Sequence, residues 1–329
     1  MSASTVLNVQ DLTVRFPGAS ANVVDGLSFT IVAGRTLAIV GESGCGKSVT
    51  SLALMGLLPE STRIQAGRAD FIGQALLSLT AAERLDIRGN QLAMIFQEPM
   101  TSLNPVFTVG EQIAEGMIRH QGLSRAEARE RALQMLEKVR VPDARKRLDA
   151  YPHELSGGMR QRVMIAIALA NNPALIIADE PTTALDVTIQ AQILGLIASL
   201  QADTGTAMIL ITHDLGVVAE VADDVVVMYA GRVVESGSVQ AIFDDPQHPY
   251  TIGLMGSMPS LGPRQARLAT IAGRVPTANE MPAGCRFAGR CPFVLDACRA
   301  ERPPLYEVSP GHFAACLRVP LENHAGVTA

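Results

Sequence analysis

The chain lacks an apolar run long enough to cross a membrane. No window of about 18 apolar residues is free of charges or helix breakers, and residues 163–178, the best candidate, are interrupted at 171–173 by Asn-Asn-Pro. The first residues carry neither a basic start nor an apolar core segment, so we expect no signal peptide. We therefore expect a cytoplasmic protein whose contact with any membrane passes through a partner.

An excess of basic residues is also missing. The 27 Lys and Arg residues face 32 Asp and Glu residues, which gives a net charge of −5 at pH 7. Without a basic field, the composition gives no indication of nucleic-acid binding. The 48% hydrophobic and 18% charged residues are ordinary for a globular protein. A chain of 329 residues can form one large domain or two modest ones.

The most specific pattern present is a glycine-rich loop between a strand and a helix. Residues 41–48 match the P-loop pattern of Gly, four residues, Gly, Lys and then Ser or Thr. Lys47 is expected to reach the β- and γ-phosphates of a nucleotide, and the Ser48 hydroxyl to bind Mg²⁺. The phosphates would lie at the N-terminus of the following helix. The expected nucleotide-binding residues here are Gly41, Glu42, Ser43, Gly44, Cys45, Gly46, Lys47, Ser48 and Val49.

Predicted strands and helices alternate through most of the chain. Ser124 and Glu127 form a capping-box pattern before residues with helical spacing. The expected elements are strands at 7–16, 26–32, 36–40, 175–178, 207–211 and 224–229, and helices at 49–58, within 110–140 and at 188–200. This alternation predicts an α/β fold with a parallel sheet covered by helices on both faces.

Two carboxylates follow the apolar strand at 175–178. Asp179 is expected to organise the Mg²⁺ shell. Glu180 is expected to act as the general base for the water that attacks the γ-phosphate. An acidic turn without a catalytic role is the alternative, but a P-loop upstream favours ATP hydrolysis.

Residues 155–161, Leu-Ser-Gly-Gly-Met-Arg-Gln, are the decisive motif. With the other motifs, in the same order from about residue 5 to 245, they resemble the ATP-binding cassette (ABC) family. In that family the Ser-Gly-Gly turn opens a helix that faces the γ-phosphate held by the other subunit. The resemblance implies a head-to-tail dimer in which Ser156, Gly157 and Gly158 contact the partner's ATP. An ordinary N-capped helix explains the serine but not the paired glycines.

The resemblance assigns further site residues. Gln97 is similar to the Q-loop residue that contacts Mg²⁺ and water, and His213 to the switch histidine at the γ-phosphate. Asp186 is similar to the D-loop residue at the dimer seam. Phe16 is similar to the aromatic residue that stacks on adenine, with a core phenylalanine as the alternative. The implied catalytic residues are Glu180, His213, Lys47 and Gln97.

The resemblance also implies a layout of domains. The family fold is an ABC nucleotide-binding domain with a parallel-sheet core, an N-terminal antiparallel β-subdomain and a helical subdomain, here at about 100–155. Proline becomes frequent after about residue 244. We therefore expect the ATP-binding domain at 1–244 and a small cysteine-containing extension at 245–329.

Two longer segments resemble the ATPases of dipeptide and oligopeptide importers. They are 97–105, Gln-Glu-Pro-Met-Thr-Ser-Leu-Asn-Pro, and 179–190, Asp-Glu-Pro-Thr-Thr-Ala-Leu-Asp-Val-Thr-Ile-Gln. Residues 247–251 and the cysteines beyond them are similar to that type's C-terminal region. The resemblance implies a peripheral ATPase on the cytoplasmic face of the inner membrane. Its partners would be two transmembrane permease subunits, a second related ABC ATPase and an extracytoplasmic substrate-binding protein.

Other functions stay open. Importers of nickel, glutathione, haem or sugars share the core motifs. A soluble ABC protein acting on ribosomes or DNA usually has two cassettes or a long coiled coil, whereas this chain has one cassette and no sustained heptads. A regulatory module that binds ATP without turnover would not need Lys47, Glu180 and His213 together.

Four of the five cysteines, Cys285, Cys291, Cys298 and Cys316, lie close together in the expected extension. Four thiolates can hold a [4Fe–4S] cluster. Structural zinc usually shows closer Cys pairs than these, and free thiols are the third interpretation. The resemblance to dipeptide-importer ATPases favours the iron–sulfur cluster. Cys45 belongs to a variable P-loop position and is not an expected ligand.

Overall fold

The computed structural model describes residues 4–182, 187–257 and 271–321. The chain divides into two compact units. The unit that we call the P-loop unit comprises Leu7–Ile31, Thr36–Leu77 and Ile211–Ala329. The unit that we call the helical unit comprises Met1–Val6, Val32–Arg35 and Ser78–Leu210. No helix in the described ranges is long and apolar enough to span a bilayer.

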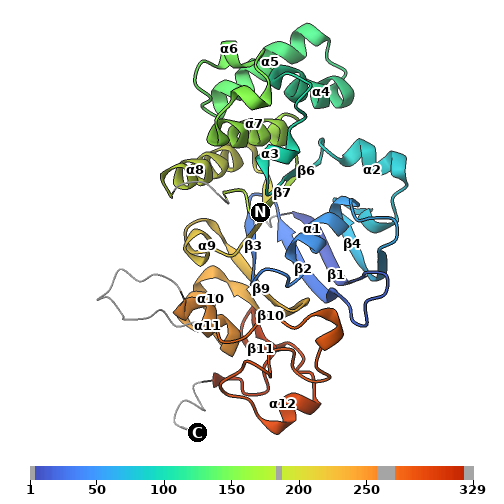
Figure 1. Ribbon diagram of the computed structural model, residues 1–329, viewed down its shortest axis with the longest axis vertical. Coiled ribbons are helices and arrows are strands. Elements are labelled where there is room, and N and C mark those ends of the chain that lie inside the picture. Colours follow the sequence, from blue (N-terminus) through green and yellow to red (C-terminus); the bar gives the residue numbers. More distant parts are fainter. Residues whose placement is uncertain (1–3, 183–186, 258–270, 322–329) are drawn as a thin grey trace. The chain divides into compact units, whose positions relative to one another are not determined.

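One sheet of the P-loop unit has the strand order β2-β1-β4-β5 (Figure 1). Its strands are β1 (Thr5–Arg15), β2 (Val24–Val32), β4 (Arg63–Phe71) and β5 (Gln74–Ala75). Leu7, Val9, Leu12 and Val14 of β1 are buried, and polar residues stand between them. This alternation is the reason that the segment forms a strand with one face toward the core. The strands expected at 7–16 and 26–32 are confirmed.

The second sheet of the P-loop unit carries the P-loop and the last strands of the chain. In the order β11-β12-β10-β9-β3, β3 pairs parallel with β9, and the pairs β9–β10, β10–β12 and β12–β11 are antiparallel. The strands are β3 (Thr36–Val40), β9 (Asp224–Tyr229), β10 (Arg232–Ser238), β11 (Tyr306–Ser309) and β12 (His312–Ala314). The helices are α1 (Lys47–Met55), α9 (Leu215–Val221), α10 (Val239–Asp244), α11 (Pro249–Gly256) and α12 (Asp296–Ala300).

Aromatic rings from separate segments meet in the core of this unit. The centroid of Tyr229 at the end of β9 lies 4.7 Å from that of Tyr250 in α11 and 5.1 Å from that of Phe287. All three side chains are buried, together with Val40 and Val227. The residues after 245 thus share a hydrophobic core with the strands beside the P-loop.

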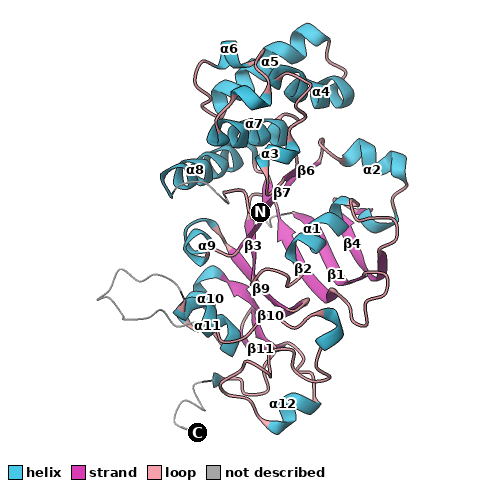
Figure 2. Cartoon of the chain, viewed as in Figure 1, coloured by secondary structure: helices cyan, strands magenta, loops and turns pink. Residues whose placement is uncertain are grey.

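The helical unit contains three neighbouring strands and most of the longer helices (Figure 2). Its strands, in the order β8-β7-β6, are β6 (Leu92–Ile95), β7 (Leu175–Asp179) and β8 (Ala207–Thr212). The β6–β7 pair is parallel. The helices are α2 (Ala81–Ile87), α3 (Pro99–Ser102), α4 (Val109–Gln121), α5 (Arg125–Lys138), α6 (Ala144–Arg147), α7 (Gly157–Leu169) and α8 (Val187–Thr204).

The helices α4 and α5 of this unit begin at polar caps. The capping box of Ser124 and Glu127 is confirmed at the start of α5, and Thr108 and Glu111 form a second one at α4. In each box the hydroxyl accepts a backbone N–H and the glutamate accepts the N–H of the cap, so two exposed donors are satisfied. The helices α4, α5 and α7 contact one another and each carries buried side chains. Figure 1 shows them as one packed group.

Candidate nucleotide-binding and hydrolysis site

The P-loop closes around the ammonium group of its own lysine. Lys47 is the first residue of α1 and is 5% exposed. Its Nζ donates to the carbonyl oxygens of Gly41 at 2.6 Å and Glu42 at 3.1 Å. These hydrogen bonds hold the positive charge of Lys47 at the N-terminus of α1. A positive charge at a helix N-terminus is an arrangement that binds phosphate.

Two P-loop positions require glycine. Gly46 has φ 105°, and a Cβ there would lie 2.7 Å from the carbonyl oxygen of Val23. A Cβ at Gly41 would collide with the carbonyl oxygen of Met228. The loop therefore reaches its close approach to neighbouring backbone only because these side chains are absent.

The other P-loop residues differ in exposure. Ser43, Gly44 and Ser48 are exposed, Glu42 and Val49 are half-buried, and Cys45 is buried. Burial raises the pKa of the Cys45 thiol, which keeps it uncharged. The exposed residues Ser43, Gly44 and Ser48 are therefore the part of the loop that a nucleotide could reach.

The expected Mg²⁺ ligand Asp179 ends β7, and the expected general base Glu180 begins the next turn, within the helical unit. Asp179 is the last residue of β7 and is 5% exposed. Glu180 has φ 45°, a left-handed conformation that is uncommon outside glycine and concentrates at functional sites. The side chain of Gln161 in α7 donates a hydrogen bond to the carbonyl oxygen of Pro181, which stabilises this turn.

The structure brings Gln97 and Glu180 together. The side-chain nitrogen of Gln97 donates to Oε2 of Glu180 at 3.0 Å. The glutamine follows β6 and the glutamate follows β7, and these strands are parallel neighbours. The carboxyl ends of adjacent parallel strands meet at one sheet edge, so residues 83 positions apart in sequence can share a site.

Ser156 caps α7, the helix that the Ser-Gly-Gly turn opens. Its Oγ accepts the backbone N–H of Met159 at 3.4 Å, and Ser156 and Gly157 are both exposed. A Cβ on Gly158 would lie 3.4 Å from Ile189 of α8, at the short end of ordinary van der Waals contact. The exposed N-terminus of α7 can accept a negatively charged group from outside.

The remaining expected nucleotide contacts are His213, Phe16 and Asp186. His213 is exposed in the turn between β8 and α9, where Asp214 caps α9 by accepting two backbone N–H groups. Phe16 is half-buried directly after β1. Asp186, the expected D-loop residue, lies outside the described residues.

The four C-terminal cysteines line one small cavity of about 20 Å³. Burial raises the pKa of Cys291 and of Cys316 to about 11, and it also raises the pKa of Cys285. In the described ranges, no group of three or more His, Cys, Asp or Glu side chains has an arrangement that could hold a metal ion. The cysteines expected to act together are thus near one another, while a metal centre is not shown.

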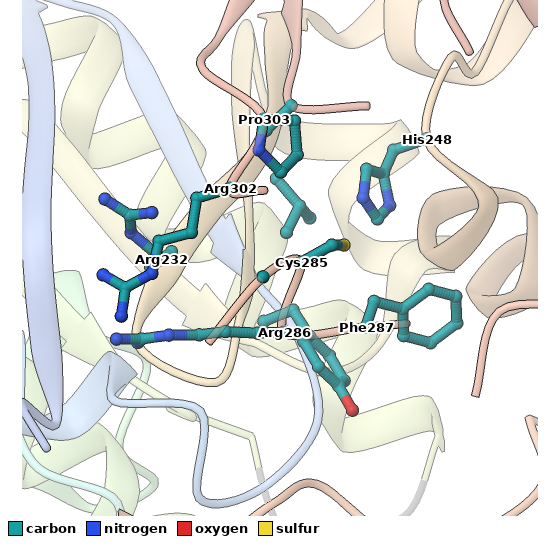
Figure 3. A pocket seen from close by; sticks show the side chains of 11 residues that line it. Arg232, His248, Cys285, Arg286, Phe287, Arg302 and Pro303 are labelled. Carbon is teal, nitrogen blue, oxygen red and sulfur yellow. The ribbon is translucent and has the colours of Figure 1, made fainter. Parts of the chain in front are cut away.

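A neighbouring cavity of about 30 Å³ shares Cys285 and His248 with the first (Figure 3). Figure 3 shows the guanidinium groups of Arg232, Arg286 and Arg302 on one side, away from His248. Oδ2 of Asp25 lies 2.6 Å from Arg286 and 3.3 Å from Arg232. Neither Asp25 nor these arginines belong to a recognisable sequence motif, and sequence reasoning missed them.

Known proteins resemble the chain over nearly its whole length. The family described as "ABC transporter" matches residues 24–183, and the one described as "Oligopeptide/dipeptide transporter, C-terminal region" matches 234–298. The probable peptide ABC transporter ATP-binding protein y4tR of Sinorhizobium fredii is 55% identical over 96% of both chains. The oligopeptide transport ATP-binding protein OppD of Salmonella typhimurium is 52% identical, covering 98% of this chain and 96% of OppD. The dipeptide transport ATP-binding protein DppD of Escherichia coli is 50% identical, covering 97% and 98%.

Solved structures agree on the fold. A dimeric ATP-binding cassette in a post-hydrolysis state, bound to ADP and Pi, has a TM-score of 0.64 and 28% identity over 71% of this chain and 98% of that one. The protein cbiO1 of Clostridium perfringens, part of an ABC transporter complex, has a TM-score of 0.64 and 27% identity over 73% of this chain and 91% of its own. The expected ABC nucleotide-binding fold is therefore confirmed, and the chain belongs to the ABC transporter ATP-binding proteins, in the group related to the oligopeptide and dipeptide transport ATPases.

Proposed function

We propose that the chain is the ATP-hydrolysing subunit of an ABC importer that takes up dipeptides or oligopeptides. The observation that carries the catalytic part is the strained Glu180, whose carboxylate is held at 3.0 Å by Gln97 at the edge of two parallel strands. A carboxylate held in this way can orient and deprotonate a water molecule. The peptide substrate is supported by the whole-length similarity to OppD and DppD.

Different residues of the chain have different roles in phosphoryl transfer to water. Lys47 and the P-loop N–H groups bind the phosphates, Phe16 stacks on adenine, and His213 contacts the γ-phosphate. The water oxygen forms a bond to the γ-phosphorus, the bond to ADP breaks, and Glu180 takes the proton of the water. Catalysis rests on positioning and on stabilisation of negative charge.

The donor groups expected at Mg²⁺ suit that ion. Ser48 offers a hydroxyl, Gln97 an amide oxygen and Asp179 a carboxylate, and Mg²⁺ prefers such oxygen ligands. Mg²⁺ held by these residues would neutralise phosphate charge. Ser156, Gly157, Gly158 and Asp186 complete the nucleotide site of a second ATPase subunit in a sandwich dimer.

The permeases would dock on the loop before α4. Val106 is 71% exposed and Phe107 50% exposed, although both are large and apolar. Gln112 of α4 supports the loop, because its side chain accepts the N–H of Asn104 and donates to the carbonyl oxygens of Asn104 and Phe107. A firmly held apolar loop suits a short permease helix at the cytoplasmic face of the membrane. A substrate-binding protein outside the membrane and a second related ATPase complete the importer.

For the C-terminal region at 245–329, we propose a [4Fe–4S] cluster bound by Cys285, Cys291, Cys298 and Cys316. The four cysteines line one cavity, but within the described residues their side chains are not placed to ligate a metal ion. A cluster would cross-link the segments that carry the four thiolates. Purification without oxygen should yield about four iron and four sulfide per chain. Stoichiometric zinc without iron would replace this assignment by a structural zinc site. The absence of both metals would replace it by free thiols.

The importer is tested by isolating its complex. A tagged Glu180→Gln chain, purified from its native membranes with ATP and Mg²⁺, should retain two membrane proteins and a second ABC ATPase, because ATP binds but is not hydrolysed. Glu130→Gln, which changes an exposed glutamate of α5, is the matched control and should retain its partners no better than the wild type does. Ribosomal or purely soluble partners would overturn the importer while leaving the ATPase chemistry intact. Uptake assays with labelled peptides, nickel, glutathione, haem and sugars would then separate the possible substrates.

A further inference from the structure

The side chain of Glu42, the second P-loop residue, is held by an arginine from the C-terminal region. The guanidinium of Arg290 donates to both carboxylate oxygens of Glu42, at 2.6 Å and 2.9 Å. The side chain of Arg290 is 7% exposed and that of Glu42 is 31% exposed. A bidentate pair of this kind fixes orientation as well as distance.

Arg290 is itself held from several sides. Its Nε donates to the carbonyl oxygen of Ala272 at 2.8 Å and its Nη2 to that of Ile271 at 3.1 Å. Its Nη1 lies 3.3 Å from the Tyr229 hydroxyl, and the guanidinium lies 5.7 Å from the centre of that ring. A side chain with so many fixed contacts presents its charge to Glu42 at a defined point.

The backbone of Glu42 is held by a second C-terminal residue. Its N–H donates to the Tyr250 hydroxyl at 2.8 Å. Tyr250 is fully buried in α11, and its ring packs edge-on against Tyr229. The side chain and the N–H of one P-loop residue are therefore fixed by residues 248 and 208 positions later in the chain.

The position of Glu42 affects the whole loop. Its carbonyl oxygen accepts from Lys47 Nζ at 3.1 Å and from the N–H of Cys45 at 3.3 Å. Displacement of Glu42 would therefore disturb the lysine that receives the phosphates. A loop held in its binding shape beforehand loses less conformational freedom when the ligand arrives.

We propose that Arg290 and Tyr250 are positioning residues that hold the P-loop in its nucleotide-binding shape, so that the C-terminal region sets the affinity for ATP. This role rests on nucleotide binding at the P-loop, as in the proposed function. It acts through Glu42, and neither residue needs to touch the nucleotide. It also assigns a function to Tyr250, which the catalytic mechanism does not use.

The test measures ATP binding and turnover of the full-length chain. In a Glu180→Gln background, Arg290→Gln and Glu42→Gln should each weaken ATP binding about tenfold, which corresponds to about 1.4 kcal/mol. The double variant should be no weaker than either single variant, because both remove the same pair. With Glu180 intact, Arg290→Gln should raise KM about tenfold and leave kcat within about twofold. Arg290→Lys should fall between, because it keeps the charge and loses the bidentate fork.

The control is Arg274→Gln, which removes an exposed ion pair with Glu280 in the same region. It should leave both KM and ATP affinity unchanged. Tyr250→Phe removes only the hydroxyl, should raise KM about threefold, and provides the test if Arg290 variants do not fold. Additive losses in the double variant, or ATP affinities of Arg290→Gln and Tyr250→Phe equal to that of Arg274→Gln, would overturn the proposal. A wild-type chain that fails to bind ATP would instead refute the proposed function.

Discussion

Glu235 of β10 offers the sharpest test of how the C-terminal region is held. Its carboxylate is fully buried. It accepts the backbone N–H of Gln247 at 2.6 Å and that of His248 at 2.9 Å, and it lies 2.8 Å from Nε2 of His312 in β12. One side chain thus joins β10 to the segment before α11 and to the neighbouring strand β12.

Replacement of Glu235 by Gln preserves the shape and removes an acceptor. The two backbone N–H groups use different carboxylate oxygens, so an amide can satisfy only one of them and its NH₂ must face the other donor. A buried donor without a partner costs about 1–3 kcal/mol, and the surviving bonds lose the charge that strengthens them. We expect a loss of about 3 kcal/mol, which would lower the melting temperature by roughly 6–12 °C for a unit of this size.

The assay is thermal unfolding together with hydrogen exchange at the amides of Gln247 and His248. These amides should exchange faster in Glu235→Gln than in the wild type. The matched control is Glu307→Gln, which changes an exposed glutamate that accepts the N–H of Gly311 and should lower the free energy of unfolding by less than about 1 kcal/mol. Equal melting temperatures for the two variants, with unchanged exchange, would refute the structural reasoning.

Three further predictions concern the nucleotide and partner sites. Gly46→Ala should destabilise the chain by about 2–4 kcal/mol in thermal unfolding and weaken ATP binding, because φ 105° and the Val23 carbonyl oxygen both oppose a Cβ. The control Gly18→Ala, at a glycine with a positive φ but open space, should cost about 1 kcal/mol in the same unfolding experiment. Equal costs for the two variants would contradict the steric argument. Ser156→Ala should abolish turnover while monomers bind ATP normally in titrations; a parallel loss of monomer binding would exclude its action on the partner's nucleotide. Val106→Asp should reduce the amount of co-purified permease while changing the free energy of unfolding by no more than about 0.5 kcal/mol. Leu305→Asp, which changes another exposed apolar residue, should not reduce the amount of co-purified permease. Equal permease recovery with both variants would exclude the loop from the docking surface.

Much of the fold could be predicted from local patterns. The P-loop, the capping box at Ser124 and the buried strands at 175–178, 207–211 and 224–229 all appear where the sequence predicts them. Each depends on residues within one turn or one strand, so spacing and polarity are sufficient. The sequence does not predict β4, because most of its residues are exposed and only Ala69 and Phe71 are buried, which is too short an alternation to indicate a strand.

The site could be predicted in part. Motif resemblance named Gln97 and Glu180 individually, and the structure adds that they are hydrogen-bonded and that Glu180 is strained. The assigned roles of the site residues, and the domain boundary at 244, stay predictions. The composition change after that point indicated a distinct region but carried no information on what the region packs against.

The sequence by itself determined the chemistry that contiguous residues carry: a phosphate loop, an acidic strand end and a capped Ser-Gly-Gly helix. Backbone geometry and side-chain order suffice there, because all the participating atoms lie within a few residues. Only the tertiary structure decided that Arg290 and Tyr250 hold Glu42, that Glu235 joins β10 to His248 and His312, and that four cysteines face one cavity. Such contacts join residues far apart in the chain, and they exist only when strand pairing and core packing bring those segments together.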